Sequence, residues 1–567
     1  MPSSATEEVS IHSHPDVDIE SLLNLFFAKK YDVLIQQLEP LLALYPDWLT
    51  GWKILSDTYL VQQKDARVPA QKALLLNQHD PKEHCYYGLV LKNQNDLVGA
   101  AQAFEQAVFL KPDYVEALNN LGIVYKDMGN YALGIDYFKR ALELAPNYAS
   151  CFSNLLFCLS HDDSVNTLDL FDTHLYYAQL YEQPARWPKH SNLKAPGRVL
   201  NIGIVSSCFR EHSLSSFLLP MLPYLQQIPS LNLYAYACSP IADEVTTKLK
   251  AHFQHWQPVD QLNDSALADK IRADKIDILL DLDGHTSDNR LTMFALKPAP
   301  IQVSWLGYLA TTGLSAMDYY LGDNYLLPEK QLDKQFSEKL VQLPVNAPFA
   351  PSSLSPVINT LPAIKNGYIT FACFNRVNKI NQSTVQLWSQ ILKRNPASKL
   401  LLIADIDSGN HNILLGWFQQ YGTQHQLIFK ARTSMQNYLA LHHEVDICLD
   451  TMPSNGVTTT CHAAWMGVPT LCITGSRMSS RGAQAIMQHL GLNQFIAENT
   501  DSYVALSQNI SEHLTELSEV RIQLRQRFEQ SRLAQGKLAA ASLNHAFRQM
   551  WKRWCSGKKA KSFSLNP

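Results

Sequence analysis

The chain has 567 residues, which is too many for one hydrophobic core, and its 46% apolar and 17% charged residues are ordinary for folded protein. We therefore expect several folded domains and little disorder. A formal net charge of −3 provides no overall basic field, which argues against a nucleic-acid-binding protein but leaves local anion sites open.

The first 17 residues contain acids and no apolar core, so they do not resemble a secretory signal, and we expect them to be flexible. No run of about 18 apolar residues follows that could span a membrane. The ten cysteines show no CxxC pair and no regular spacing. This pattern favours reduced thiols in a cytoplasmic protein and argues against structural zinc.

A repeat follows the N-terminal segment. Gly88 and Phe104 recur 34 residues later as Gly122 and Phe138, and a proline closes both segments. This is the spacing of tetratricopeptide repeats, in which a small residue lets two helices approach and an aromatic residue fills the space between them. We expect three to four such repeats over residues 18–165 and a helical linker over residues 166–196.

From Val199 on, the pattern changes to short apolar strands that alternate with helical segments. The predicted strands are VLNIGIVS, LNLYAYAC, IDILLDLDG, IQVSWLG, YITFACFN, SKLLLIAD, LIFKA, VDICLD and TLCIT. Such alternation predicts parallel sheets with crossover helices. A segment rich in Pro, Ser and Asn divides the strands into two groups, so we expect two doubly wound lobes, at 197–355 and 356–535. A C-terminal helix and a basic, solvated tail should occupy residues 536–567.

The stretch DTMPSNGVTTTCHAAWMGVPT begins at Asp450, where a predicted strand gives way to a helix. Ligands of doubly wound sheets bind at the carboxyl ends of strands. A helix that starts after Gly456 would present unpaired backbone N–H groups and threonine hydroxyls beside a positive dipole end, which suits a phosphate group. The alternative is that Thr458 merely caps the helix.

Three long motifs resemble a known family: PAPIQVSWLGYLATTGLSAMDYYLGD, FACFNRVNKINQSTVQLWSQILKRNP and VDICLDTMPSNGVTTTCHAAWMGVPTL. They are similar to the catalytic region of O-linked N-acetylglucosamine transferases and SPINDLY-type proteins, and the resemblance covers roughly residues 80–550. It implies an all-α tetratricopeptide superhelix followed by an α/β GT-B fold with two Rossmann-like lobes. The region between the lobes, about residues 345–365, is short, as in bacterial members.

The resemblance also implies an activity and its site residues. Family members transfer a sugar from a nucleotide-sugar to Ser or Thr hydroxyls of proteins, with inversion and without a required metal. Lys379 matches a lysine at the donor diphosphate, where an ammonium stabilises the departing phosphate. His212 matches a loop histidine that either accepts the acceptor proton or positions substrate. The donor-binding residues implied in this way are Thr286, Arg376, Gly456, Val457, Thr458, Thr459 and His462.

Three positions depart from the family pattern. His462 stands where the family contacts the donor ribose through an acid, Val457 replaces a histidine of animal members, and Arg376 replaces a glutamine. These departures leave the nucleotide base open. In the loop that carries Thr286, His285 is the weaker candidate for donor contact.

The best prediction is therefore an inverting protein O-glycosyltransferase that uses UDP-GlcNAc, with no metal or other cofactor and no nucleic-acid or membrane partner. The acceptor polypeptide would lie along the repeats, where Asn119 and Asn120 either bind its backbone or support helix packing. Two rivals within enzymes are O-fucosyl transfer and N-linked glucosyl transfer to asparagine. A rival of another class is a repeat scaffold with little turnover. Asp281-Leu282-Asp283 has the form of a metal-binding DxD motif, but we expect it only to end a parallel strand.

Overall fold

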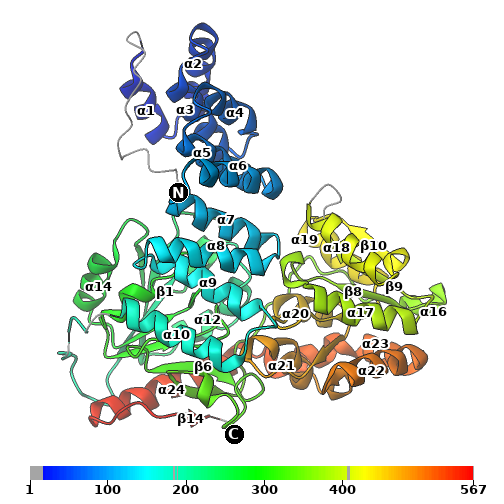
Figure 1. Ribbon diagram of the computed structural model, residues 1–567. Coiled ribbons are helices and arrows are strands. Elements are labelled where there is room, and N and C mark those ends of the chain that lie inside the picture. The colour runs from blue at the N-terminus through cyan, green and yellow to red at the C-terminus, as the bar shows by residue number, and fades with distance from the viewer. Residues whose placement is uncertain (1–16, 183–184, 188, 405–408, 566–567) are drawn as a thin grey trace. The chain divides into compact units, whose positions relative to one another are not determined.

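The computed structural model describes residues 17–182, 185–187, 189–404 and 409–565 (Figure 1). The segment that the sequence predicts to be flexible, residues 1–17, lies outside this range except for its last residue. The chain divides into two compact units, Met1–Pro146 and Asn147–Pro567. The predicted domain boundaries stay predictions.

The first unit consists of antiparallel helix pairs. A Cβ added at Gly88 would lie 2.8 Å from the ring of Phe104, and one added at Gly122 would lie 2.5 Å from the ring of Phe138. Both rings are fully buried, so glycine is needed because an aromatic ring of the partner helix occupies the space. The helices are α1 (Ile19–Phe27), α2 (Tyr31–Leu44), α3 (Leu49–Val61), α4 (Arg67–Leu76), α5 (Pro81–Asn93), α6 (Leu97–Leu110), α7 (Val115–Asp127) and α8 (Tyr131–Leu144).

The second unit begins with one more helix pair, α9 (Ala149–His161) and α10 (Thr167–Tyr181). Its first lobe is an eight-stranded parallel sheet of order β14-β7-β6-β5-β4-β1-β2-β3. The strands are β1 (Leu200–Ser206), β2 (Leu231–Ala237), β3 (His255–Pro258), β4 (Ile278–Asp281), β5 (Ile301–Ser304), β6 (Tyr319–Asp323), β7 (Lys339–Leu343) and β14 (Phe563–Ser564). The helices between them are α11 (Ser215–Leu218), α12 (Leu222–Gln226), α13 (Glu244–Lys250), α14 (Asp264–Ala273), α15 (Leu291–Ala295) and the 3-10 helix η1 (Asp333–Gln335).

The second lobe is a six-stranded parallel sheet of order β10-β9-β8-β11-β12-β13. Its strands are β8 (Thr370–Cys373), β9 (Lys399–Ile403), β10 (Leu427–Lys430), β11 (Ile447–Leu449), β12 (Thr470–Ile473) and β13 (Ile496–Ala497). Its α-helices are α16 (Pro362–Asn366), α17 (Gln382–Arg394), α18 (Gly409–Gln420), α19 (Met435–Leu441), α20 (Thr458–Trp465), α21 (Gly482–His489), α22 (Thr500–Glu512) and α23 (Leu514–Gln530). The 3-10 helices are η2 (Val377–Lys379), η3 (Gln424–Gln426), η4 (His442–Glu444), η5 (Met478–Ser480), η6 (Asn493–Phe495) and η7 (Arg532–Ala534).

The C-terminal segment returns to the first lobe. Helix α24 (Gly536–Cys555) packs against α12, and its Trp551 Nε1 donates to the carbonyl of Ala195 at 3.1 Å. After it, Phe563 pairs with Val341 of β7 in parallel register. The tail that composition suggested to be solvated therefore adds an edge strand to the sheet.

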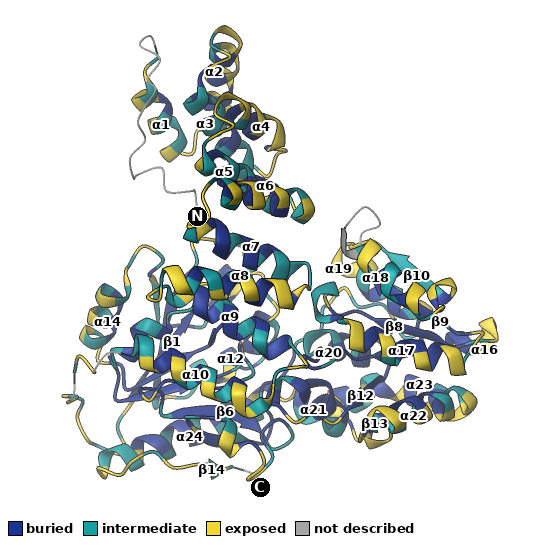
Figure 2. Ribbon diagram, in the orientation of Figure 1, coloured by how far each residue is buried: buried dark blue, intermediate teal, exposed yellow. Residues whose placement is uncertain are grey.

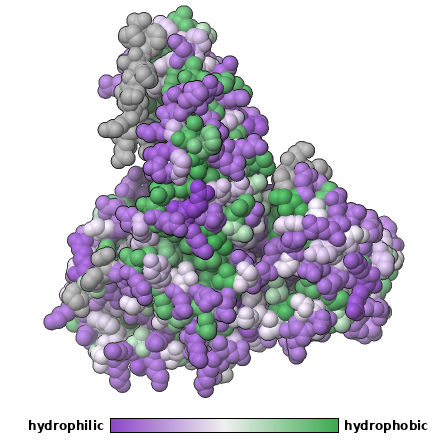
Figure 3. Space-filling view, in the orientation of Figure 1, coloured by the Kyte–Doolittle hydropathy of each residue, from purple (hydrophilic) through white to green (hydrophobic). Residues whose placement is uncertain are grey.

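The inner strands of both sheets are mostly buried and dark blue in Figure 2, whereas the edge strands β3, β10 and β14 are only partly buried. Exposed residues lie on the outer faces of the helices. The face of the molecule seen in Figure 3 is mostly hydrophilic, with apolar side chains scattered among polar ones. Within the described ranges, no helix is long and apolar enough to cross a membrane. The predicted fold class, helical repeats followed by two parallel α/β sheets, is confirmed.

Candidate functional site

The candidate site forms at the carboxyl ends of two neighbouring strands in the second lobe. Strands β8 and β11 are paired in parallel, with Ile447 opposite Phe371 and Cys448 opposite Ala372. The chain after β8 leads to Lys379, and the chain after β11 leads to the start of α20. Parallel pairing brings these two connections together, although about 75 residues separate them in sequence.

Lys379 ends the short 3-10 helix η2 and reaches across to the connection after β11. Its Nζ donates a hydrogen bond to the carbonyl oxygen of Asn455 at 2.6 Å. Burial lowers the pKa of Lys379 to about 8, while the negative charge of Asp450 acts in the opposite direction. The structure thus brings the predicted lysine to the predicted helix start.

The start of α20 is open. Val457 is its N-cap residue, and no side chain caps the helix, which removes the capping alternative for Thr458. The Gly456 N–H donates to Asp450 Oδ1 at 2.9 Å, so this amide is occupied. The N–H groups of the first helical turn, from Val457 on, find no acceptor within the helix. They present an anion-binding end beside the Lys379 ammonium.

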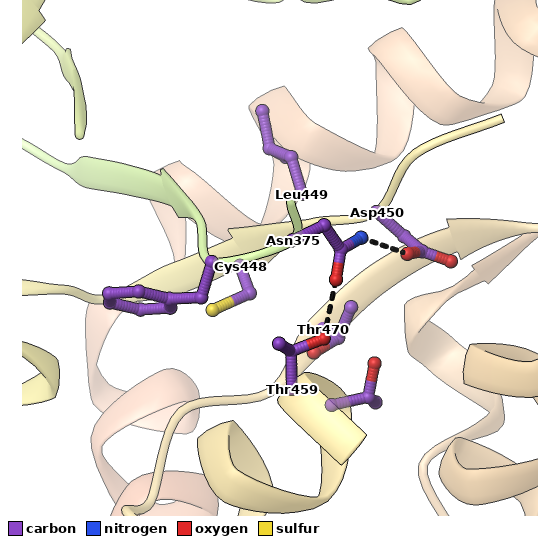
Figure 4. A pocket seen from close by; sticks show the side chains of 8 residues that line it. Asn375, Cys448, Leu449, Asp450, Thr459 and Thr470 are labelled. Carbon is purple, nitrogen blue, oxygen red and sulfur yellow. Dashed lines mark hydrogen bonds between the residues drawn. The ribbon is translucent and has the colours of Figure 1, made fainter. Parts of the chain in front are cut away.

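Asn375 and Asp450 join the two connections (Figure 4). Asn375 Nδ2 donates to Asp450 Oδ1 at 3.1 Å and to Thr451 Oγ1 at 2.8 Å, and Asn375 Oδ1 accepts the hydroxyl of Thr459. Asn375, Asp450 and Thr459 line a small pocket between the two connections. Burial raises the pKa of Asp450 to about 7, against the opposing effects of the Gly456 N–H and of Lys379. Sequence reasoning assigned no role to Asn375 or Asp450.

His462 lies on the buried side of α20. Its ring makes edge contacts with Phe349 at a centroid distance of 5.3 Å and with Tyr438 at 5.5 Å. Burial lowers the pKa of His462 to about 4, so the imidazole is neutral at pH 7. A carboxylate in this aromatic environment would be costly, which agrees with the departure from the family pattern.

His212 lies in the first lobe, on the loop between β1 and α11. The Leu214 N–H donates to its Nδ1 at 3.3 Å, and its Nε2 lies 3.9 Å from Cys208 Sγ. Burial lowers the pKa of His212 to about 4, assisted by the charges of Arg210 and Arg376. Arg376, the residue before η2 in the second lobe, is therefore near enough to act electrostatically on the His212 ring. Because Nδ1 accepts a hydrogen bond, the neutral ring carries its proton on Nε2, which can donate to a substrate oxygen.

The loop that carries Thr286 follows β4. The Thr286 hydroxyl donates to the carbonyl of Asp283 at 2.9 Å, and the residue is half-buried. His285 is 1% exposed. Its Nδ1 lies 3.0 Å from Ser153 Oγ of α9, and its Nε2 lies 2.9 Å from the carbonyl of Thr312. His285 therefore anchors the loop, whereas Thr286 stays on its more exposed side.

The carboxylates of the Asp281-Leu282-Asp283 motif are occupied within the fold. Asp281 accepts from the Gly284 N–H at 3.0 Å and from Ser304 Oγ at 3.1 Å. Asp283 accepts from Ser206 Oγ at 2.8 Å. Burial raises the pKa of Asp281 to about 7 and that of Asp283 to about 6. These contacts support the structural interpretation of the motif over metal binding.

The predicted acceptor-binding residues belong to α7 of the first unit. Asn119 is buried, and its Oδ1 has no hydrogen-bond partner among the described residues. Asn120 is half-buried, and its Nδ2 lies 3.9 Å from Cys85 Sγ. A role for these residues in acceptor binding stays a prediction.

Comparisons with known proteins agree with this architecture. The model of glycosyl transferase family 41 matches residues 155–349 and 359–543, and tetratricopeptide repeat models match residues 115–148 and 88–129. A solved O-GlcNAc transferase mutant from Thermobaculum terrenum is 30% identical with a TM-score of 0.82, covering 87% of this chain and 94% of that one.

Curated plant relatives are similar at the sequence level. A protein of Petunia hybrida named probable UDP-N-acetylglucosamine–peptide N-acetylglucosaminyltransferase SPINDLY is 33% identical over 67% of this chain and 41% of its own length. The Arabidopsis thaliana protein of the same name is 33% identical over 69% of this chain and 43% of its own length. The chain thus spans about two fifths of the length of these relatives.

Proposed function

Since the chain belongs to glycosyl transferase family 41, we propose that it transfers N-acetylglucosamine from UDP-GlcNAc to Ser or Thr hydroxyls of polypeptides, with inversion. The names of the plant relatives and of the Thermobaculum structure support this donor and this acceptor class. The proposed place of action is the cytoplasm, where thiols such as the ten of this chain stay reduced.

One observation carries the proposal: the Lys379 ammonium lies against the open N-terminus of α20. When the bond between the sugar and the diphosphate breaks, negative charge develops on the departing phosphate. A fixed ammonium and a set of unpaired N–H groups stabilise that charge more than they stabilise the intact donor, so they lower the barrier. Arg376 and the Thr458 hydroxyl contribute further positive charge and a further donor on the same side.

His212 positions the reacting groups from the opposite lobe. With its pKa near 4, its imidazole is neutral at pH 7 and carries no charge that would oppose Lys379. The Nε2–H donates to a substrate oxygen, whereas the Thr286 hydroxyl on the same lobe gives its proton to the carbonyl of Asp283 and can only accept a hydrogen bond from substrate. In this assignment His212 orients substrate, and removal of the acceptor proton does not depend on its Nδ1, which is occupied by the Leu214 N–H.

The test uses the full chain, UDP-GlcNAc and a co-expressed library of Ser/Thr peptides, with the mass increase of each peptide as the readout. An increment of one N-acetylhexosamine in the wild type, lost in Lys379→Ala and kept in Lys393→Ala, supports the proposal. Lys393 is an exposed lysine of α17 and serves as the matched control. A thermal-shift comparison of UDP- and GDP-sugars identifies the base. If wild type and Lys379→Ala are equally inert while peptides still bind, the scaffold interpretation replaces this one.

A further inference from the structure

Three consecutive threonines open α20, and the structure gives each of their hydroxyls a different environment. The Thr460 hydroxyl donates to the carbonyl of Gly456 at 2.8 Å, and the Thr459 hydroxyl donates to Asn375 Oδ1. The Thr458 hydroxyl has no hydrogen-bond partner among the described residues. A threonine hydroxyl has one proton to donate, and the hydroxyls of Thr459 and Thr460 already donate theirs to groups of the protein.

We propose that Asn375 and Asp450 are positioning residues of the donor site, and that Thr459 acts through Asn375 instead of contacting the donor diphosphate. Thr458 is then the threonine whose hydroxyl meets the diphosphate, together with the amides of the first turn. This inference rests on the proposed function, because it divides the roles of residues within the same site.

The side-chain amide of Asn375 is fully used. Its two N–H groups go to Asp450 Oδ1 and Thr451 Oγ1, and its oxygen accepts from Thr459. Figure 4 shows this amide between the Asp450 carboxyl group and the Thr459 hydroxyl. Because donors and acceptors are both satisfied, the amide has one favourable orientation, and it fixes the first turn of α20 against the end of β8.

Asp450 holds the other side of the same turn. Its Oδ1 accepts from the Gly456 N–H as well as from Asn375. One oxygen therefore joins the end of β11, the end of β8 and the turn that leads into α20. Lys379 Nζ closes the arrangement from the far side through the carbonyl of the adjacent Asn455. The direction in which the free amides of the first turn point is therefore set by the hydrogen bonds of Asn375 and Asp450.

A double-mutant cycle on UDP binding, measured by calorimetry with the full chain, separates the two roles of threonine. We expect Thr459→Val, which removes one buried hydrogen bond, to weaken UDP binding about tenfold. Asn375→Ala removes three hydrogen bonds and should weaken UDP binding at least as much. The affinity of the double variant for UDP should be no lower than that of the single variant with the lower affinity. Thr458→Val combined with Asn375→Ala should instead show the product of the two single losses. Thr459→Ser, which restores the hydroxyl, should recover most of the affinity lost in Thr459→Val.

Several outcomes would overturn the inference. Multiplying losses in the Thr459→Val, Asn375→Ala pair would mean that Thr459 contacts the diphosphate independently. An unchanged affinity in Thr459→Val would remove its role altogether. If Asn375→Ala does not fold, Asp450→Asn, which keeps an oxygen acceptor, takes its place in the cycle. A wild type that binds neither UDP nor GDP would refute the proposed function and this inference together, whereas UDP binding with multiplying losses refutes the inference alone.

Discussion

At Gly456 the chain has room for a hydrogen atom but not for a methyl group. A Cβ built there would lie well inside van der Waals contact with Asn375 Oδ1 and Thr459 Oγ1, the two atoms that join β8 to α20. The backbone dihedrals do not demand glycine at this position, since its φ is not positive. Glycine is required because the side chains of Asn375 and Thr459 approach its Cα closely. A Cβ at this position would push them apart and break the hydrogen bond between them.

We predict that Gly456→Ala displaces the first turn of α20, weakens UDP binding at least tenfold and lowers the free energy of unfolding by about 1–3 kcal/mol, the usual cost of overpacking. Calorimetry and urea denaturation measure the two effects. Gly416→Ala is the control: Gly416 lies in α18 with open space around its Cβ position, so the substitution should raise stability by about 0.5–1 kcal/mol. Normal UDP binding in Gly456→Ala would show that the turn tolerates displacement.

The charge of Lys379 depends on pH within an accessible range. Burial lowers its pKa to about 8, so the ammonium is present at pH 7 and is lost as the pH rises through 8. The dissociation constant of UDP, whose phosphates are fully ionised over this interval, should therefore increase above pH 8, approaching a tenfold increase for each pH unit. Calorimetric titrations at pH 7, 8 and 9 measure this increase.

Lys379→Arg provides the comparison, because a guanidinium stays protonated throughout this range. Its affinity for UDP should be lower than that of the wild type at pH 7 but should not change up to pH 9. Parallel pH profiles for the two proteins would mean that another group causes the loss of binding.

At the scale of elements, the alternation of apolar runs predicts nine strands, and each of these nine segments contains a strand in the structure. Other strands were not predicted. Two of them, Tyr319–Asp323 (β6) and Lys339–Leu343 (β7), contain glycine or charged and amide residues, which weaken the apolar pattern. The two-residue strands β13 and β14 have no pattern of their own and exist only because a neighbouring strand offers them partners. Tertiary pairing, which a local pattern does not contain, decides such strands.

The candidate site likewise combines residues that local sequence identifies with residues that only strand pairing brings together. Lys379 and the helix start after Gly456 could be predicted because their motif and their position after strands are local features. Asn375 and Asp450 were not assigned because an amide or a carboxylate after a strand is common in turns. Their hydrogen bond joins residues 75 positions apart, and only the pairing of β8 with β11 brings them together. A prediction that β8 and β11 are neighbours in the sheet would have placed these two residues side by side.

The contact between α9 and the loop after β4 belongs to the same scale. His285 Nε2 lies 2.9 Å from the carbonyl of Thr312, so it carries the ring proton, and Nδ1 is left to accept from Ser153 Oγ. Ser153→Ala would leave that nitrogen buried and unpaired. We predict a loss of about 1–3 kcal/mol in the free energy of unfolding, measured by urea denaturation.

Ser150→Ala on the same helix is the matched control, because Ser150 is exposed and its loss should change stability by less than about 0.5 kcal/mol. Equal effects of the two substitutions would show that the hydrogen bond to His285 adds nothing beyond the helix propensity of alanine.

At the scale of the whole molecule, the last helix pair belongs to the unit that holds both lobes. His174 Nε2 of α10 lies 2.9 Å from the Tyr308 hydroxyl in the first lobe. The connection between α9 and α10 contacts the second lobe, where Arg477 donates to the carbonyl of Asp162 at 3.3 Å and the Ser383 hydroxyl donates to Asp163. Ser383 follows Lys379 by four residues, so this helix pair supports the segment that carries the proposed catalytic cation.

The position of a truncation should therefore decide whether a donor site survives. We predict that residues 147–567, expressed alone, unfold cooperatively and bind UDP with the affinity of the full chain, because every contact described for the site lies within that unit. Residues 167–567 lack α9 and uncover His285, whose Nδ1 then loses Ser153. This shorter fragment should aggregate or bind UDP far more weakly, as size-exclusion chromatography and calorimetry would show. Equal UDP affinity in both fragments would mean that α9 is not needed for the donor site, and that the loop after β4 keeps its conformation without the contact to Ser153.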